Sequence, residues 1–260
     1  MGTEMVEHLF ESTADGEQEP YLVSLPESDT PVPLVVGLHT WSCDRFNQVD
    51  AMLPYCRERG WGLVLPEFRG PNLTVNPRAP QACASPLAQQ DILDALDAVL
   101  GEGASDADNV FLLGGSGGGH MALMMAAHAP GRWRGVSSWV PITDLAAWHA
   151  QNPNYAPHIV ACCGGSPGRS DDVDREYRTR SPLLLAEKLA AANLYVHHGR
   201  FDASVPYTHT SNLVHEVEKH QPERFFHEIF DGGHELRYDV AFRWFDTLAT
   251  DQRAGTEATG

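Results

Sequence analysis

The stretch NVFLLGGSGGGH, residues 109–120, decides the fold of this chain. It opens with an apolar run, Val110–Leu113, short enough for a buried strand, and leads into good helix formers from Met121 to Ala127. Between the two runs lies G-x-S-x-G. A serine in such a tight strand-to-helix turn has a strained backbone and an exposed hydroxyl. The helix start supplies backbone N–H groups where an oxyanion would form, so the pattern predicts that Ser116 is a nucleophile.

A phosphate-binding loop is the alternative interpretation of so many glycines. The Lys-Ser/Thr pair that such a loop needs does not follow here, and the spacing is not G-x-G-x-x-G. The nucleophile is therefore favoured, provided that a base and a carboxylate lie further along the chain.

Length, charge and cysteine content narrow the class of protein. The 260 residues suit one α/β domain, and 35 acidic against 18 basic residues give a net charge of −17, which disfavours nucleic acid and anionic membranes as partners. Five cysteines without C-x-x-C spacing indicate reduced, buried thiols rather than a zinc site or a disulfide framework, so we expect no metal. The acidic N-terminus contains no long apolar run. We therefore expect a cytoplasmic protein, a monomer or small homo-oligomer, without a signal peptide or membrane span.

Strand-like and helix-like segments alternate along the chain, without repeats. After two short strands at 8–12 and 21–25, we expect strands at 34–39, 61–66, 110–113, 135–140, 193–198 and 224–230. Helices are expected at 47–59, 87–100, 121–127, 183–192, 207–220 and 235–248. The order predicts a mostly parallel, doubly wound sheet flanked by helices. We divide the chain into an N-terminal strand and turn (1–19), a single α/β domain (20–250) and a polar tail (251–260).

A serine hydroxyl needs a base to take its proton, and thirteen histidines compete for that role. His234 has the best position, because it follows the strand at 225–230 on a loop loosened by Gly232 and Gly233. From there it can reach back over the strand ends. His234 is therefore the predicted base.

The third member of a triad is a carboxylate that orients the imidazole. Asp202 follows the strand at 194–198 and lies on a loop at the same edge of the sheet. The order Ser116, Asp202, His234 is the one expected for a triad on such a sheet. Asp144 is the runner-up, although N-capping of the next helix explains it better.

The remaining candidates surround the expected oxyanion. Gly117 should supply one N–H donor, and the loop after the strand at 34–39 should supply the other, from Trp41 or, failing that, from Thr40.

The long loops at 67–85 and 143–180 are expected to build the substrate pocket. Its candidate contacts are Thr40, Arg69 and Trp148. Arg169 and Arg200 are further possible anion anchors, although surface charge explains these arginines as well.

Three motifs, GGSGG at 114–118, HHGRFDASVP at 197–206 and GHE at 233–235, carry a resemblance to a known family. From about Tyr21 to Leu248 the chain resembles an α/β-hydrolase, and in particular the catalytic domain of prolyl-oligopeptidase-like serine hydrolases and related esterases. The resemblance implies cofactor-free acyl transfer. The peptidases of that group carry an N-terminal β-propeller, whereas only about thirty residues precede the parallel strands here.

Three functions are consistent with these observations. The first is hydrolysis of a small carboxylic ester through an acyl-enzyme on Ser116. The second is an amino- or oligopeptidase that acts on short peptides and lacks a propeller. The third is a non-catalytic binding protein, since a fold does not determine a function. Ester hydrolysis ranks first, because no anchor for a peptide terminus is evident in the sequence.

Overall fold

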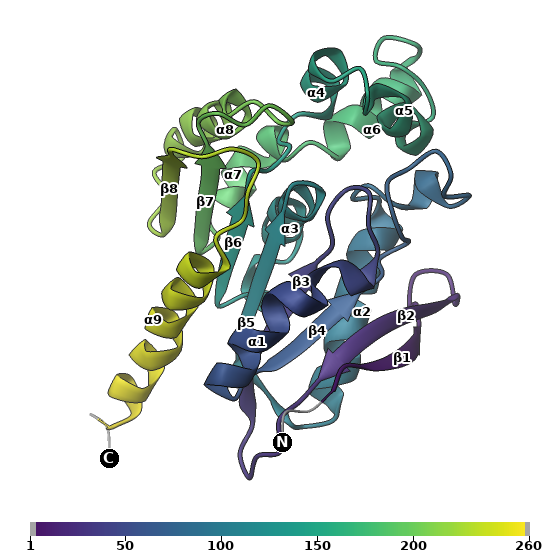
Figure 1. The fold of residues 1–260 in the computed structure, drawn as a ribbon. Coiled ribbons are helices and arrows are strands. Elements are labelled where there is room, and N and C mark those ends of the chain that lie inside the picture. The colour runs from purple at the N-terminus through teal and green to yellow at the C-terminus, as the bar shows by residue number, and fades with distance from the viewer. Residues whose placement is uncertain (1–3, 258–260) are drawn as a thin grey trace.

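An eight-stranded sheet forms the centre of the molecule (Figure 1). The computed structural model describes residues 4–257, with side chains described through residue 249. The strands are β1 (Val6–Glu11), β2 (Gln18–Ser24), β3 (Val32–Leu38), β4 (Gly62–Pro66), β5 (Ser105–Gly115), β6 (Gly135–Trp139), β7 (Leu194–Gly199) and β8 (Phe225–Phe230). In space they follow the order β1-β2-β4-β3-β5-β6-β7-β8.

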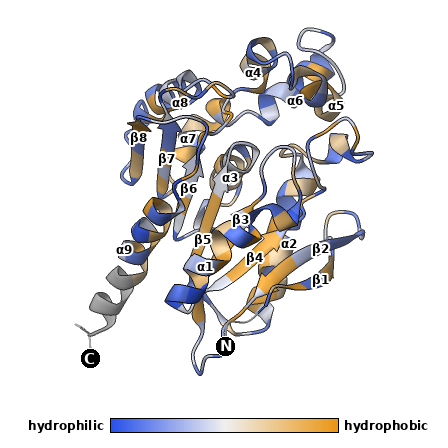
Figure 2. Cartoon of the chain, in the orientation of Figure 1, coloured by the Kyte–Doolittle hydropathy of each residue, from blue (hydrophilic) through white to orange (hydrophobic). Residues whose placement is uncertain are grey.

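Strands β3 to β8 are parallel, and the hairpin β1-β2 joins antiparallel to β4 at one edge. The central strands are continuous apolar runs because helices cover both of their faces, and Figure 2 shows β3, β4 and β5 as mainly hydrophobic. The single-domain α/β-hydrolase fold predicted from the sequence is confirmed.

Helices cover both faces of the sheet (Figure 1). They are α1 (Val49–Arg59), α2 (Pro86–Gly101), α3 (Gly117–His128), α4 (Leu145–Gln151), α5 (Ala156–Cys163), α6 (Asp171–Thr179), α7 (Ala186–Leu189), α8 (Thr208–Glu218) and α9 (Tyr238–Glu257). Short 3-10 helices lie at Arg45–Gln48, Ala79–Gln81, Pro130–Arg132 and Pro182–Leu185. One hydrophobic cluster joins α2, α3, α7 and α8 to the sheet, and a second joins α1 and α9 to the opposite face. Among residues 4–257, none of the helices combines the length and the hydropathy that a bilayer span requires.

The segment 143–180, expected to be an irregular loop, contains the three helices α4, α5 and α6. Figure 1 places them beyond the carboxyl ends of the parallel strands. Each helix is too short to show a clear hydrophobic period, which is why the sequence pattern missed them. Side-chain caps start two of them: Asp144 accepts from two N–H groups of α4, and Ser170 accepts from one of α6. All three then pack into a third cluster around Trp41 and Trp148.

Both domain boundaries drawn from the sequence fall inside elements. The boundary after residue 19 lies within β2, because the N-terminal hairpin belongs to the same sheet. The boundary after residue 250 lies within α9, which starts at Tyr238 rather than Glu235 and continues to Glu257. No proline interrupts this segment, so the backbone stays helical through polar sequence. Residues 258–260 of the predicted tail, like residues 1–3, lie outside the described residues.

Candidate active site

Ser116 occupies a strained turn between β5 and α3. Its φ of 56° and ψ of −120° are rare for a residue with a side chain. The neighbours hold it there: its N–H donates to Trp139 O at 2.9 Å. Glycine is required on both sides, because a Cβ at Gly114 would lie 2.2 Å from Gly118 O, and one at Gly118 would lie 2.6 Å from Leu38 O. The predicted strand, elbow and helix are therefore present.

His234 and Asp202 are in hydrogen-bond contact, with 2.6 Å between His234 Nδ1 and Asp202 Oδ2. Since a carboxylate can only accept, Nδ1 carries the proton, and the lone pair of Nε2 is free to act as a base. Asp202 Oδ1 accepts from the backbone N–H groups of Ser204 and Val205 at 2.8 and 2.9 Å. The carboxylate is therefore fixed on both oxygens.

The environment of Asp202 keeps it ionised. Burial of its side chain raises the pKa, but hydrogen bonds from His198, His234 and the Val205 N–H outweigh burial and lower the pKa well below its usual range. His198 Nε2 lies 2.8 Å from Val205 O and 3.3 Å from Asp202 Oδ2. The sequence gives no role to His198, and its place four residues before Asp202 is the one signal that points to it.

The loop that carries His234 lies against the strained turn that carries Ser116. A Cβ at Gly199, the last residue of β7, would lie 2.0 Å from Gly233 O. A Cβ at Gly115, next to the serine, would lie 2.3 Å from the side chain of Leu236. The residues on either side of His234 thus pack over the ends of β5 and β7, the edge of the sheet where Ser116 lies.

The backbones of Trp41 and Gly117 are adjacent, since a Cβ at Gly117 would lie 2.4 Å from Trp41 N. Among the described residues, no hydrogen-bond acceptor is within reach of the backbone N–H of either residue. The N–H of Thr40 is already occupied, because it donates to Asn47 Oδ1 at 3.1 Å. Of the two candidates for the second oxyanion donor, Trp41 therefore has the free N–H group.

Trp148 lies beside the loop after β3 that carries Thr40 and Trp41, which we call the oxyanion loop, but its side chain is fully buried. Its ring contacts Trp41 edge-on at 4.8 Å, and its Nε1–H donates to Ser204 O at 3.0 Å. Tyr155 stacks on the Trp148 ring at 4.8 Å and lies edge-on to the Trp41 ring at 6.4 Å. Trp148 thus ties the helices above the sheet to the loop that carries Asp202, and the half-buried Tyr155 is the more exposed aromatic of the group.

Arg69 does not fit the expected role as a substrate contact. Its guanidinium is fully buried and bonded to Asp91 and Asp15, with Glu19 within 3.6 Å. Burial lowers its pKa, but the bonds to Asp15 and Asp91 outweigh this and raise it. The sequence could not reveal this role, because these carboxylates are distant in the chain. Arg69 joins the N-terminal hairpin to α2.

The other charged candidates are also accounted for. Asp144 accepts from Ala146 and Ala147 N–H, which confirms it as a helix N-cap. Arg200 lies 3.5 Å from Asp231, and Arg169 faces Gly164 O at 3.4 Å. Within residues 4–257, no group of three or more His, Cys, Asp or Glu side chains is arranged to hold a metal ion.

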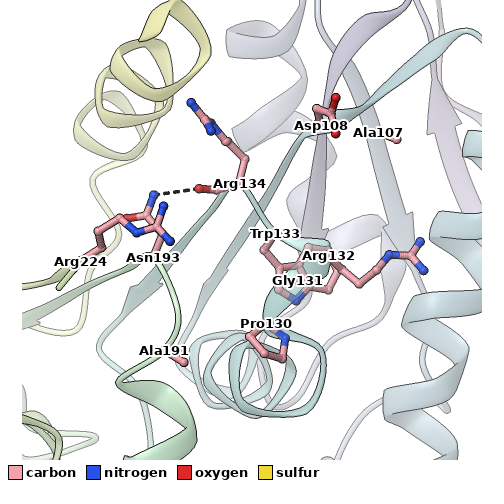
Figure 3. A pocket seen from close by; sticks show the side chains of 10 residues that line it. All are labelled: Ala107, Asp108, Pro130, Gly131, Arg132, Trp133, Arg134, Ala191, Asn193 and Arg224. Carbon is pink, nitrogen blue, oxygen red and sulfur yellow. Dashed lines mark hydrogen bonds between the residues drawn. The ribbon is translucent and has the colours of Figure 1, made fainter. Parts of the chain in front are cut away.

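A hollow of about 200 Å³ lies at the opposite end of the sheet, where β5 to β8 begin (Figure 3). Three arginines line it, but their guanidinium groups diverge (Figure 3). Arg132 pairs with Asp97, and Arg134 donates to Leu248 O. This hollow is therefore neither the substrate site nor a convergent anion site.

Residues 87–249 match the sequence model described as Prolyl oligopeptidase family. The chain is 30% identical, over 211 residues, to acylamino-acid-releasing enzyme 1 of Oryza sativa subsp. japonica, covering 74% of this chain and 26% of that protein. The fold is similar to that of an acylaminoacyl peptidase of Pyrococcus horikoshii, with a TM-score of 0.75, 21% identity, and coverage of 90% of this chain and 38% of that one. A puromycin-hydrolyzing peptidase of Mycobacterium tuberculosis gives a TM-score of 0.78 and 20% identity, with coverage of 95% and 38%. The chain spans about a quarter of the length of the curated relatives that it matches.

Proposed function

Because the chain belongs to the prolyl oligopeptidase family, we propose that it is a serine peptidase that hydrolyses an amide bond of a short peptide. The observation that carries the proposal is the 2.6 Å contact between His234 and Asp202, at the edge of the sheet where Ser116 occupies its strained turn. In the neutral imidazole, the acceptor-only carboxylate keeps the proton on Nδ1 and leaves the lone pair of Nε2 available, as a base requires.

In the proposed reaction, Ser116 Oγ attacks the carbonyl carbon of the scissile bond and His234 Nε2 takes its proton. Asp202 stabilises the resulting imidazolium. The negative oxygen of the tetrahedral intermediate accepts from the N–H groups of Gly117 and Trp41. The imidazolium then protonates the leaving amine, and water, deprotonated by the same histidine, releases the acyl group.

A peptide now ranks above an ester, which reverses the order reached from the sequence. Two curated relatives are named as acylamino-acid-releasing enzymes, and the two similar solved structures described above are named as peptidases. Ester turnover alone would not rank the ester above the peptide. The same catalytic groups also attack an activated ester, which has a better leaving group than an amide. An N-acylated peptide is accordingly the first substrate class to test.

The test compares three chromogenic substrates with small acyl groups: N-acetyl-alanyl p-nitroanilide, alanyl p-nitroanilide and p-nitrophenyl acetate. We expect turnover of the acylated anilide, and its loss in Ser116→Ala at unchanged Tm. Preference for the free amine would indicate an aminopeptidase. Hydrolysis of the acetate with neither anilide would contradict the peptidase, and activity in Ser116→Ala would contradict the nucleophile.

The third function weighed from the sequence, a non-catalytic binding protein, predicts a different result. No base would activate Ser116 in such a protein, so a fluorophosphonate probe would not label it. We expect labelling at Ser116, because Asp202 and His234 are already in contact.

A further inference from the structure

His39 has a buried imidazole whose two nitrogens both face carbonyl oxygens. Its Nδ1 lies 2.8 Å from Thr40 O and its Nε2 lies 3.0 Å from Glu67 O. The ring stacks flat on Phe68, with centroids 3.9 Å apart and planes 4° apart. The reaction proposed above makes no use of this histidine, which directly follows β3 and begins the oxyanion loop.

Thr40 O and the Trp41 N–H belong to one peptide group. A trans peptide is planar, and its C=O and N–H point in opposite directions. Whatever holds Thr40 O therefore sets the direction of the Trp41 N–H. Two donors reach this oxygen: His39 Nδ1 at 2.8 Å, and the Cys43 N–H at the longer distance of 3.3 Å.

We propose that His39 is a positioning residue for the oxyanion site: its Nδ1–H donates to Thr40 O and so aims the Trp41 N–H at the substrate oxygen. The inference rests on the proposed function, since it concerns the same site. It extends that function by naming the group that preorganises one oxyanion donor.

The proton on the ring can serve only one of the two carbonyls. Burial lowers the pKa of His39, and the hydrogen bonds to Thr40 and Glu67 oxygens and the charges of Glu67 and Asp44 raise it by less. Glu67 is itself paired with Arg45, with 2.8 Å between Glu67 Oε2 and Arg45 Nη1. The ring is therefore neutral at neutral pH, with one N–H donor. We place that proton on Nδ1, because the contact of Nδ1 with Thr40 O is shorter than the contact of Nε2 with Glu67 O.

Two substitutions of His39 by an amide side chain distinguish the roles of its two ring nitrogens. In His39→Asn the side-chain NH₂ falls near the position of Nδ1 and can still donate to Thr40 O, whereas in His39→Gln it falls near Nε2 and reaches Glu67 O instead. We expect His39→Asn to keep kcat for the acylated anilide within about fivefold of the wild type. His39→Gln should lower kcat by about 10- to 100-fold, less than the 10²- to 10³-fold loss typical of deleting a donor outright, with KM changed by less than twofold.

A purely structural role predicts a different pattern. If both variants lose activity equally, or if activity follows Tm, the inference is wrong. Phe68→Leu is the matched control, because it removes the ring stack and leaves both carbonyl contacts. We expect it to lower Tm with kcat nearly unchanged.

A neutron structure of the wild-type protein tests the same point without any variant. A deuteron on Nδ1 of His39 supports the inference, and one on Nε2 alone overturns it. Failure of the proposed function looks different: the wild-type protein would hydrolyse no substrate and would not react with a fluorophosphonate, and the inference would then fall with it.

Discussion

Replacing Asp202 with asparagine tests the geometry of the triad in detail. The asparagine can keep its oxygen on the N–H groups of Ser204 and Val205, which now bind Oδ1 at 2.8 and 2.9 Å. Its NH₂ then takes the place of Oδ2 and faces His234 Nδ1 at about the present 2.6 Å. Two N–H donors cannot share that contact, so His234 must move its proton to Nε2. In that tautomer it has no lone pair for Ser116.

In a serine protease triad, the same Asp→Asn change, which leaves the histidine in the wrong tautomer, lowers kcat by about 10⁴-fold. At about 1.36 kcal/mol per tenfold, this corresponds to about 5 kcal/mol of lost transition-state stabilisation. We expect a fall of 10³- to 10⁴-fold in kcat for the acylated anilide, measured at pH 7.5, with Tm within a few degrees of the wild type. The assay needs active-site titration, so that the residual activity measured for the variant is not that of contaminating wild-type enzyme.

Asp144→Asn is the matched control for the loss of a carboxylate. Asp144 caps α4 through Oδ1, and asparagine is an equally good N-cap, so we expect its activity to stay within twofold. Asp202→Asn with more than a tenth of wild-type activity would refute the reasoning. So would an equal loss in Asp144→Asn.

The remaining predictions concern the oxyanion site, the buried charges and acid stability. Gly117→Ala should lower kcat at least 100-fold, because its Cβ would lie 2.4 Å from Trp41 N and displace the oxyanion loop; unchanged steady-state kinetics would contradict this. Arg69→Met should destabilise the protein by about 3–5 kcal/mol in urea unfolding, because Asp91 stays buried without its partner, whereas KM of the folded fraction should not change. Burial lowers the pKa of three histidines to about 4, 3 and 4: His120, His197 and His209. The unfolded chain binds more protons than the folded one between pH 6.5 and about 4, so stability should be complete above pH 6.5 and fall below it; a urea midpoint that rises from pH 7 to pH 5 would contradict this.

Local sequence signals were enough to place the groups that follow a strand. Ser116, Asp202 and His234 were each located by an apolar run and the loop after it, because parallel strands bring their carboxyl ends to one edge. The adjacency of Gly117 and Trp41 followed from the same rule. These placements depend on chain order and need no knowledge of side-chain packing.

Contacts between distant segments could not be predicted. Arg69 looked free for a substrate because its partners Asp15 and Asp91 lie 54 and 22 residues away. The helices α4 to α6 were missed because each is too short for a clear hydrophobic period, and their buried side chains instead share one cluster with Trp41. The position of His39 between two carbonyl oxygens depends on Glu67, 28 residues further along.

Mass spectrometry after incubation with a fluorophosphonate shows directly whether Ser116 is an activated nucleophile. We expect one adduct per chain, on the peptide that contains Ser116. Labelling should run in parallel with loss of hydrolysis of the acylated anilide, and it should be absent in Ser116→Ala. An unlabelled Ser116 in folded, wild-type protein, or an adduct on another residue that accounts for the lost activity, would show that Ser116 is not the activated nucleophile.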